Sequence, residues 1–152
     1  KPDGVDNGHW RHNFGGVDLN RDWNHFNQLE TRTVSEFFEQ AAAEPGAQVY
    51  FGVDFHSTQK DVFYTLTEEF QTTPAGFLDK WLAAIDEALP DYEVNEDPGG
   101  VTTPTSKGWF YRAFGAPSVT YEVGDEVDRD VIRRNAVTAA NKLMELMLEE
   151  IE

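Results

Sequence analysis

Three short apolar segments separated by helical patterns do most to constrain how this chain of 152 residues folds. Each is rich in β-branched and aromatic residues and ends near polar or turn-forming residues, which is typical of β-strands. The three segments are 48–56, 62–66 and 118–123. Apolar residues also recur at helical spacing in 31–43, 74–89 and 128–150. Strands that alternate with helices predict an α/β layer structure.

The same spacing predicts which side of each helix faces a core. The expected inward residues are Val34, Phe37, Phe38 and Ala41 in 31–43; Leu78, Trp81, Leu82, Ile85 and Leu89 in 74–89; and Ile132, Ala136, Ala140, Leu143 and Met147 in 128–150. Segments 1–28 and 90–108 are rich in turn-forming residues and are predicted to be loops. Segment 48–56 begins with apolar residues on both faces, which predicts a buried central strand.

Polar side chains stand near the carboxyl ends of two predicted strands. Asp54 and His56 are two residues apart, so they share one face of segment 48–56. In segment 118–123, one face carries Val119, Tyr121 and Val123, and the other carries Ser118, Thr120 and Glu122. Ligands of α/β sheets bind at the carboxyl ends of strands, so His56 and Glu122 are expected to share a site.

Charge and composition exclude several function classes. The chain has 28 acidic and 12 basic residues and a formal net charge of −16, so nucleic acid is not an expected partner. It contains no cysteine, which excludes disulfides, thiolate nucleophiles and thiolate metal sites. No apolar run approaches the ~20 residues of a membrane-spanning helix. The compartment stays open, with a periplasmic or secreted location favoured over a cytoplasmic one.

Four segments, in this order, resemble one enzyme family. They are KPDG at 1–4, HWRHN and GVDLNRDW within 9–23, DFHSTQ at 54–59 and TYEVGDE at 120–126. Together they resemble the zinc metallocarboxypeptidases of the carboxypeptidase A type. The resemblance implies a single catalytic domain over 1–152, with a three-layer α/β/α fold and a mixed, mostly parallel sheet. It also implies a C-terminal portion of that domain, because the family's N-terminal strands and H-x-x-E segment are not found in the sequence.

The resemblance implies roles for three residues in the reaction. His56 matches the family's third zinc ligand, and neutral imidazole is a good zinc donor. Glu122 matches the carboxylate that takes a proton from zinc-bound water and delivers it to the leaving amine. Arg11, which follows Trp10, matches the arginine that stabilises the oxyanion. Zinc is therefore the expected cofactor, although one histidine is too few ligands for a catalytic site.

Three further residues are expected to bind substrate. Asn20 and Arg21 match the family pair that holds the terminal carboxylate, because the planar fork of arginine pairs with a carboxylate through two hydrogen bonds. Counting back from Glu122 places Lys107 near the family's specificity pocket. A cation there would favour a C-terminal Glu or Asp, or an acidic peptidoglycan-type peptide. The alternative for Lys107 is a solvent-exposed lysine in a loop.

Other positions remain open. The same count finds no clear match for the family's mobile tyrosine, and Tyr92 and Tyr111 are the nearest candidates. Asp54 is expected either to orient a neighbouring polar group or to be a solvated or capping carboxylate. Three other histidines are not expected to bind metal: His9, His12 and His25.

Three functions are compatible with these residues. The leading one is a zinc-dependent metallocarboxypeptidase that hydrolyses the C-terminal peptide bond of a peptide. An aspartoacylase-like N-acyl-amino-acid deacylase is the second, because those relatives also use a His-x-x-Glu…His zinc site and an Asn-Arg pair. The third is a catalytically inactive peptide-binding module, which the missing ligands favour. This chain alone is expected to have little activity, and an exposed sheet edge predicts self-association.

Overall fold

The computed structural model describes residues 2–151 as a series of helices and strands. The helices are α1 (Pro2–Asp6), the 3₁₀ turn η1 (Leu19–Arg21), α2 (Leu29–Ala42), α3 (Phe77–Ala88), α4 (Ser106–Phe114) and α5 (Arg129–Ile151). The strands are β1 (Gly52–Thr58), β2 (Val62–Leu66), β3 (Glu96–Gly99) and β4 (Ser118–Gly124). The prediction that residues 1–28 form only loops is wrong at α1 and η1, which are short helical turns.

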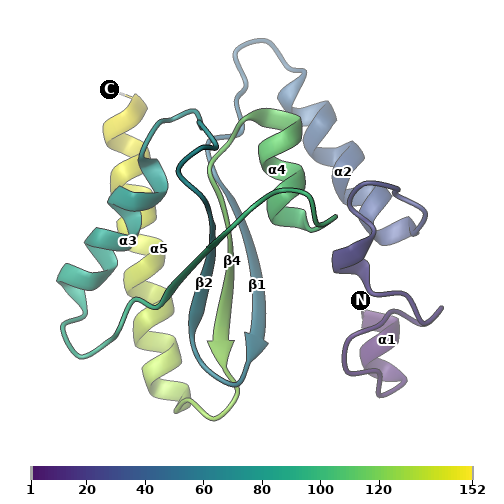
Figure 1. Ribbon diagram of the computed structural model, residues 1–152, viewed down its shortest axis with the longest axis horizontal. Helices are drawn as coiled ribbons and strands as arrows, with labels where there is room; N and C mark the ends of the chain where they lie inside the picture. Colours follow the sequence, from purple (N-terminus) through teal and green to yellow (C-terminus); the bar gives the residue numbers. More distant parts are fainter. Residues whose placement is uncertain (1, 152) are drawn as a thin grey trace.

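The four strands form one mixed sheet in the order β1-β4-β2-β3. β1 is parallel to β4 and β3 is parallel to β2, whereas β2 and β4 are antiparallel. Helices α3 and α5 lie on one side of the sheet, and α2 and α4 lie on the other (Figure 1). The predicted three-layer α/β/α fold is confirmed. The prediction of a central strand at 48–56 is wrong, because β4 pairs between β1 and β2 and leaves β1 at the edge.

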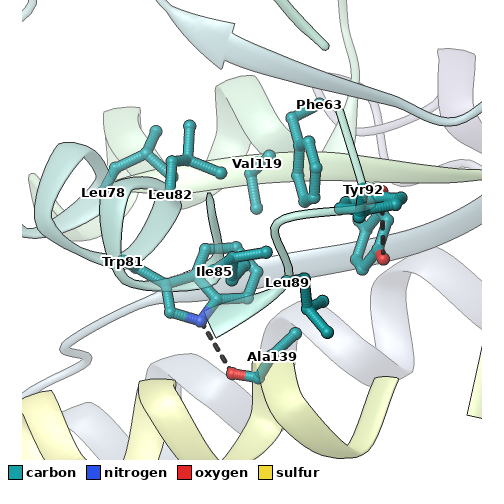
Figure 2. Packing of buried hydrophobic residues seen from close by; sticks show 10 residues of the cluster. Phe63, Leu78, Trp81, Leu82, Ile85, Leu89, Tyr92, Val119 and Ala139 are labelled. Carbon is teal, nitrogen blue, oxygen red and sulfur yellow. Dashed lines mark hydrogen bonds between the residues drawn. The ribbon is translucent and has the colours of Figure 1, made fainter. Parts of the chain in front are cut away.

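The main hydrophobic core lies between the sheet and helices α3 and α5 (Figure 2). Phe63 of β2 is fully buried, and its ring stacks on Tyr121 of β4 with ring centroids 4.3 Å apart. The Trp81 indole N–H of α3 donates to the Ala139 carbonyl of α5 at 2.8 Å, which ties the two helices together. Each large apolar side chain buried in this way contributes about 1.5–3 kcal/mol to folding. All five inward residues predicted in 74–89 belong to this core.

Helix α5 faces the core only partly as predicted, because Leu143 packs against the core but two other predicted positions do not. Ala136 and Ala140, which are predicted to point inward, are exposed, whereas Asn135 and Ala139 are buried. At these two positions the inward stripe is therefore shifted by one residue. The physical reason is the contact with α3, because small Ala139 lies against the indole of Trp81 and its carbonyl accepts the indole N–H.

Helix α2 turns part of its apolar stripe to solvent. Val34 and Phe37 are predicted to point inward, yet their exposed fractions are 41% and 65%. Phe38 packs edge-on against Trp109 and Phe110 of α4, so the described residues cover only one side of the stripe. Across residues 2–151, none of the helices combines the length and apolar character that crossing a bilayer requires.

Segment 90–108 is predicted to be a loop, and this prediction is wrong at β3 and at the start of α4. Most of α4 lies beyond that segment. The helix begins where the Thr105 hydroxyl accepts a hydrogen bond from the Gly108 N–H at 3.2 Å. It ends at Gly115, whose φ of 64° is the left-handed conformation that glycine adopts readily. Phe110 packs so closely on β1 that a Cβ on Gly52 would lie 2.5 Å from its ring. Close packing therefore fixes α4 against β1.

Candidate functional site

Alternate residues of β1, β4 and β2 form a polar floor on the sheet face opposite the main core. The backbone register pairs His56 of β1 with Glu122 of β4, and Asp54 with Thr120. Tyr64 of β2 pairs with Thr120 from the other side. Paired residues of neighbouring strands project to the same face, so the sheet brings His56 and Glu122 together as expected from their strand positions.

The loop between α1 and α2 holds Arg11 and Asn20 next to the polar floor. One carboxylate oxygen of Asp18 accepts a hydrogen bond from Arg11 Nε at 2.6 Å, and the other accepts from the Asn20 N–H at 3.0 Å. The second of these bonds caps η1, the turn that contains Asn20 and Arg21. Arg21 is exposed, and its Nη1 donates to the Asn20 carbonyl at 2.7 Å. A single aspartate thus orders the substrate-binding candidates.

Asp22 anchors this loop to the start of α2. Its buried carboxylate accepts hydrogen bonds from Thr31 Oγ1 at 2.6 Å, the Gln28 N–H at 2.8 Å and the Asn27 N–H at 3.1 Å. Burial alone would raise the pKa of Asp22, but the three hydrogen bonds favour its charged form and hold the pKa below the usual range. The charged carboxylate therefore stabilises the loop that borders the polar floor.

Ser106, the first residue of α4, connects this loop to β1. Its backbone N–H donates to Asn20 Oδ1 at 2.9 Å, and its hydroxyl donates to Asp54 Oδ2. The same carboxylate oxygen lies 2.8 Å from His56 Nε2, and Asn20 Nδ2 lies 3.2 Å from that nitrogen. The hydrogen bond with Asp54 is the largest of the effects that raise the pKa of His56. Asp54 therefore contacts neighbouring polar groups and is not a free surface carboxylate.

All six residues predicted to act in the site line one cavity of about 440 Å³. They are Arg11, Asn20, Arg21, His56, Lys107 and Glu122. A second cavity of about 430 Å³ adjoins it on the side of Trp10, Trp23 and Phe55, and Arg11, Asn20 and His56 line both. A larger cavity, about 640 Å³, contains none of the six. The chemistry of the lining side chains, not volume, therefore identifies the candidate site.

Glu122 is the one acid among the residues that line this cavity. Its Oε2 is buried and accepts no hydrogen bond from any residue in 2–151. Burial raises the pKa of Glu122, and the nearby charges of His56 and Arg11 partly oppose that rise. A carboxylate with an unused oxygen and a raised pKa is suited to proton transfer.

Lys107 is buried, with 7% of its surface exposed, so the alternative of a solvent-exposed lysine is wrong. The cause is α4, which places Lys107 in its first turn, against the sheet. Its ammonium donates to the Thr65 carbonyl at 2.5 Å, the one acceptor that the described residues provide. An ammonium has three donors, so two remain for a ligand. Burial lowers the pKa of Lys107, and the charge of Asp97 opposes that shift.

His56 has the chemistry of a metal ligand, but the described residues supply no complete metal site. Over 2–151, no three side chains of His, Cys, Asp or Glu converge in a way that could hold a metal ion. A catalytic zinc needs three protein ligands, so His56 can be only one of them. His9 Nδ1 lies 2.9 Å from the Asn13 carbonyl oxygen, and His12 and His25 are exposed.

Tyr64 lines the cavity, although no motif in the sequence indicates it. The two candidates for a mobile tyrosine lie elsewhere. Tyr92 is in the core, with its hydroxyl oxygen 3.4 Å from that of Tyr121, and Tyr111 packs edge-on against Phe70. The period of two in 62–66 places Tyr64 on the face away from the core, but the pairing of β2 with β4 is needed to show that this face borders the site.

Comparisons with known proteins give one family and a consistent fold. The family model described as succinylglutamate desuccinylase/aspartoacylase catalytic domain matches residues 2–151. No curated protein matches the chain.

Solved structures with this fold are named as carboxypeptidases. A metallo-carboxypeptidase from Burkholderia cenocepacia has a TM-score of 0.70 and 19% identity, and the match covers 99% of this chain and 42% of that one. A protein assigned as carboxypeptidase A from Shewanella denitrificans OS-217 has a TM-score of 0.67 and 19% identity, with 99% and 44% covered. The chain thus spans less than half the length of these proteins, and identity at this level shows the fold alone.

Proposed function

The chain belongs to the succinylglutamate desuccinylase/aspartoacylase catalytic-domain family, and we propose that it is part of a zinc-dependent hydrolase that removes the C-terminal residue of a peptide. The observation that supports this most is the one cavity that holds Glu122 together with His56, Arg11 and the Asn20–Arg21 pair. A module that only bound peptides would use the cations but would not need a half-buried carboxylate whose buried Oε2 has no partner among the described residues.

The proposal assigns zinc to His56 and to ligands outside residues 2–151. When bound, zinc would supply Lewis-acid chemistry that polarises the scissile carbonyl and acidifies the attacking water. Binding of substrate and transfer of the proton belong to side chains of this chain.

Binding begins at the loop that Asp18 orders. Arg21 and the amide of Asn20 hold the terminal carboxylate of the substrate, since Arg21 is exposed and uses one donor on the Asn20 carbonyl. Arg11 keeps guanidinium nitrogens beyond the Nε that bonds Asp18, and these stabilise negative charge on the carbonyl oxygen. Both arginines line the cavity that contains Glu122.

Glu122 transfers the proton. Its carboxylate takes a proton from the attacking water as the new C–O bond forms, and it gives that proton to the leaving amine as the C–N bond breaks. The raised pKa brings the carboxylate nearer to the pH at which it can both accept and release a proton. No other acid among the described residues lines this cavity, so the role has one candidate.

Lys107 sets a preference for an acidic C-terminal residue. Arg11 is already paired with Asp18, and Arg21 holds the terminal carboxylate in this proposal, so Lys107 remains as a cation of the cavity that forms no ion pair with a described residue. A side-chain carboxylate of Glu or Asp would accept its two unused donors. Burial strengthens such a contact, because the ammonium is already removed from water.

A deacylase acting on an N-acyl amino acid is the second candidate, and the family match favours it. An N-acyl aspartate or glutamate also carries two carboxylates, so the same cations could bind it. What separates the two functions is whether the acyl side of the scissile bond is a peptide or a small acid.

The test uses the longest natural polypeptide that contains this chain, purified with zinc. Matched peptides ending in Glu, Leu and Arg are compared with N-acetyl-aspartate and N-succinyl-glutamate, and the released amino acid is measured. We expect fastest release of Glu from the acidic peptide. Turnover of the acyl amino acids alone would instead assign the deacylase. Binding of peptides with no turnover of any substrate would assign the inactive module.

A further inference from the structure

We propose that Ser106 is a positioning residue that fixes the orientation of both Asn20 and His56, an inference that rests on the proposed hydrolase function. Ser106 is buried, with 3% of its surface exposed. Its two polar groups bond two different segments, the loop through the backbone N–H and β1 through the hydroxyl. No motif in the sequence marks this serine.

Ser106 can hold its two partners in place because it belongs to α4, which is packed against the sheet. Ser106 is the first residue of the helix, directly after the Thr105 cap, and the same helix packs Phe110 on Gly52 of β1. A polar group placed on a packed helix holds its partners more firmly than one placed on a loop. Ser106 therefore acts as the fixed point between two groups that must be aligned for substrate.

The N–H of Ser106 decides which way the Asn20 amide points. A backbone N–H can only donate, so the atom of Asn20 that faces it at 2.9 Å must be the oxygen. The amide nitrogen of Asn20 is thereby directed toward His56 and the cavity, 3.2 Å from His56 Nε2. This is the orientation that offers N–H donors to a substrate carboxylate.

The hydroxyl of Ser106 decides how His56 is held. The Ser106 hydroxyl donates to Asp54 Oδ2, and His56 Nε2 lies 2.8 Å from the same oxygen, so the hydroxyl fixes the carboxylate that contacts the ring. With its proton on Nε2, the neutral ring keeps Nδ1 free as the electron-pair donor. Without the hydroxyl, Asp54 would lose the contact that keeps it turned toward the ring.

Two substitutions separate the two bonds. Ser106→Ala removes the hydroxyl and keeps the N–H, so Asn20 stays oriented while Asp54 is released. Ser106→Pro removes both groups, and the helix tolerates it, because proline suits the first helical position and Thr105 already has an extended backbone (φ −95°, ψ 159°). In the longest natural polypeptide, we expect Ser106→Ala to lower kcat about tenfold with little change in KM. Ser106→Pro should lower kcat similarly and also raise KM.

A double-mutant cycle tests whether Ser106 acts through Asp54. If it does, Ser106→Ala combined with Asp54→Ala should be no less active than Asp54→Ala alone. Losses that multiply would overturn the proposal, because they would mean that the two residues act independently. Ser35→Ala is the matched control, since Ser35 is equally buried and its hydroxyl donates only to Arg32 within α2.

A readout without activity keeps this inference separate from the proposed function. The ¹⁵N signals of the His56 ring report which nitrogen carries the proton. We expect a protonated Nε2 in the parent protein and in Ser35→Ala, and a shift toward mixed tautomers in Ser106→Ala. Identical His56 signals in Ser106→Ala and the parent would overturn the positioning role. If the signals shift but no substrate is hydrolysed, the positioning holds and the hydrolase proposal fails.

Discussion

Strand β4 separates two environments that differ in how their polar groups are paired. On the core side, the Tyr121 hydroxyl lies beside that of Tyr92, and Val119 is fully buried. On the other side, Glu122 projects into the cavity and its Oε2 has no partner among the described residues. Tyr121 and Glu122, which are neighbours in sequence, therefore have different roles. On the core side, the polar and apolar groups named here contact each other and stabilise the fold. On the cavity side, the Glu122 carboxylate keeps an oxygen that is available to bind and react.

The largest effect expected on the cavity side comes from Glu122→Gln. The amide has the same shape but accepts no proton, so hydrolysis should fall by about 10²–10⁴-fold. Stability should stay equal or increase, because the change removes a half-buried charge that burial disfavours. Steady-state kinetics and thermal unfolding of the longest natural polypeptide measure both.

The matched control is Glu126→Gln, which removes the same charge from an exposed position just beyond β4. It should leave both activity and stability close to those of the parent. Glu122→Gln activity above a tenth of the parent's would show that another group transfers the proton, and the contrast between the two faces of β4 would lose its functional meaning.

On the core side, the largest effect should come from Phe63→Ala. Phe63 is fully buried and stacks on Tyr121, so its truncation should cost about 3–5 kcal/mol in the free energy of unfolding. Phe55 of β1 is 70% exposed, so Phe55→Ala should cost less than about 1 kcal/mol. Denaturant unfolding compares the two. A large cost at Phe55 would show that residues beyond 2–151 cover this ring, and that the edge of β1 is a second core.

Local sequence patterns predict those helices and strands whose own apolar spacing shows which face is buried. Residues 62–66 are β2 as predicted, β4 extends the predicted 118–123 by one residue, and all five inward positions of 74–89 are buried. Helix α4 is not predicted, because its glycine and aromatic residues have low helix propensity. Its caps, Thr105 and Gly115, were the available signal.

Patterns that depend on contacts between elements are harder to predict. The inward face of α5 depends on the contact of Ala139 with Trp81, which is 58 residues away in sequence. In the site, the six residues identified through motifs line one cavity, but Tyr64 and Ser106 lack a motif. Their importance comes from strand pairing and from the first turn of α4, which a single sequence does not encode locally.

A smaller effect, on substrate choice, is expected from Lys107→Met. Loss of the buried ammonium should lower kcat/KM for the peptide ending in Glu by about 10–100-fold, because a charge-assisted hydrogen bond is lost. The peptide ending in Leu should be cleaved at an unchanged or higher rate. Lys60→Met, at an exposed position between β1 and β2, is the control for loss of a positive charge. Equal losses with both peptides would mean that Lys107 only supports the fold.

The smallest expected effect is a change of stability with pH that depends on the charge of Lys107. Because burial lowers the pKa of Lys107 below its ordinary value of 10.5, the folded protein loses this proton at a lower pH than the unfolded chain. Between the two pKa values, the unfolded chain binds more protons at this site. Stability relative to Lys107→Met should therefore rise with pH in that window. Below it, both states are charged and the buried charge costs stability.

Over the same pH window, the preference for the peptide ending in Glu should fall while stability rises. As Lys107 loses its charge, the ratio of kcat/KM for the Glu peptide to that for the Leu peptide should fall, while the ratio for Lys107→Met stays flat. Taking ratios between peptides and between variants cancels other titrations, including those of Tyr92 and Tyr121, whose pKa values burial raises. A parent ratio that stays constant up to pH ~10.5, the usual pKa range of lysine, would show that an uncharged contact recognises the acidic side chain. The cavity side of the sheet would then recognise substrate by shape and not by charge, so that both sides of the sheet would depend on close packing.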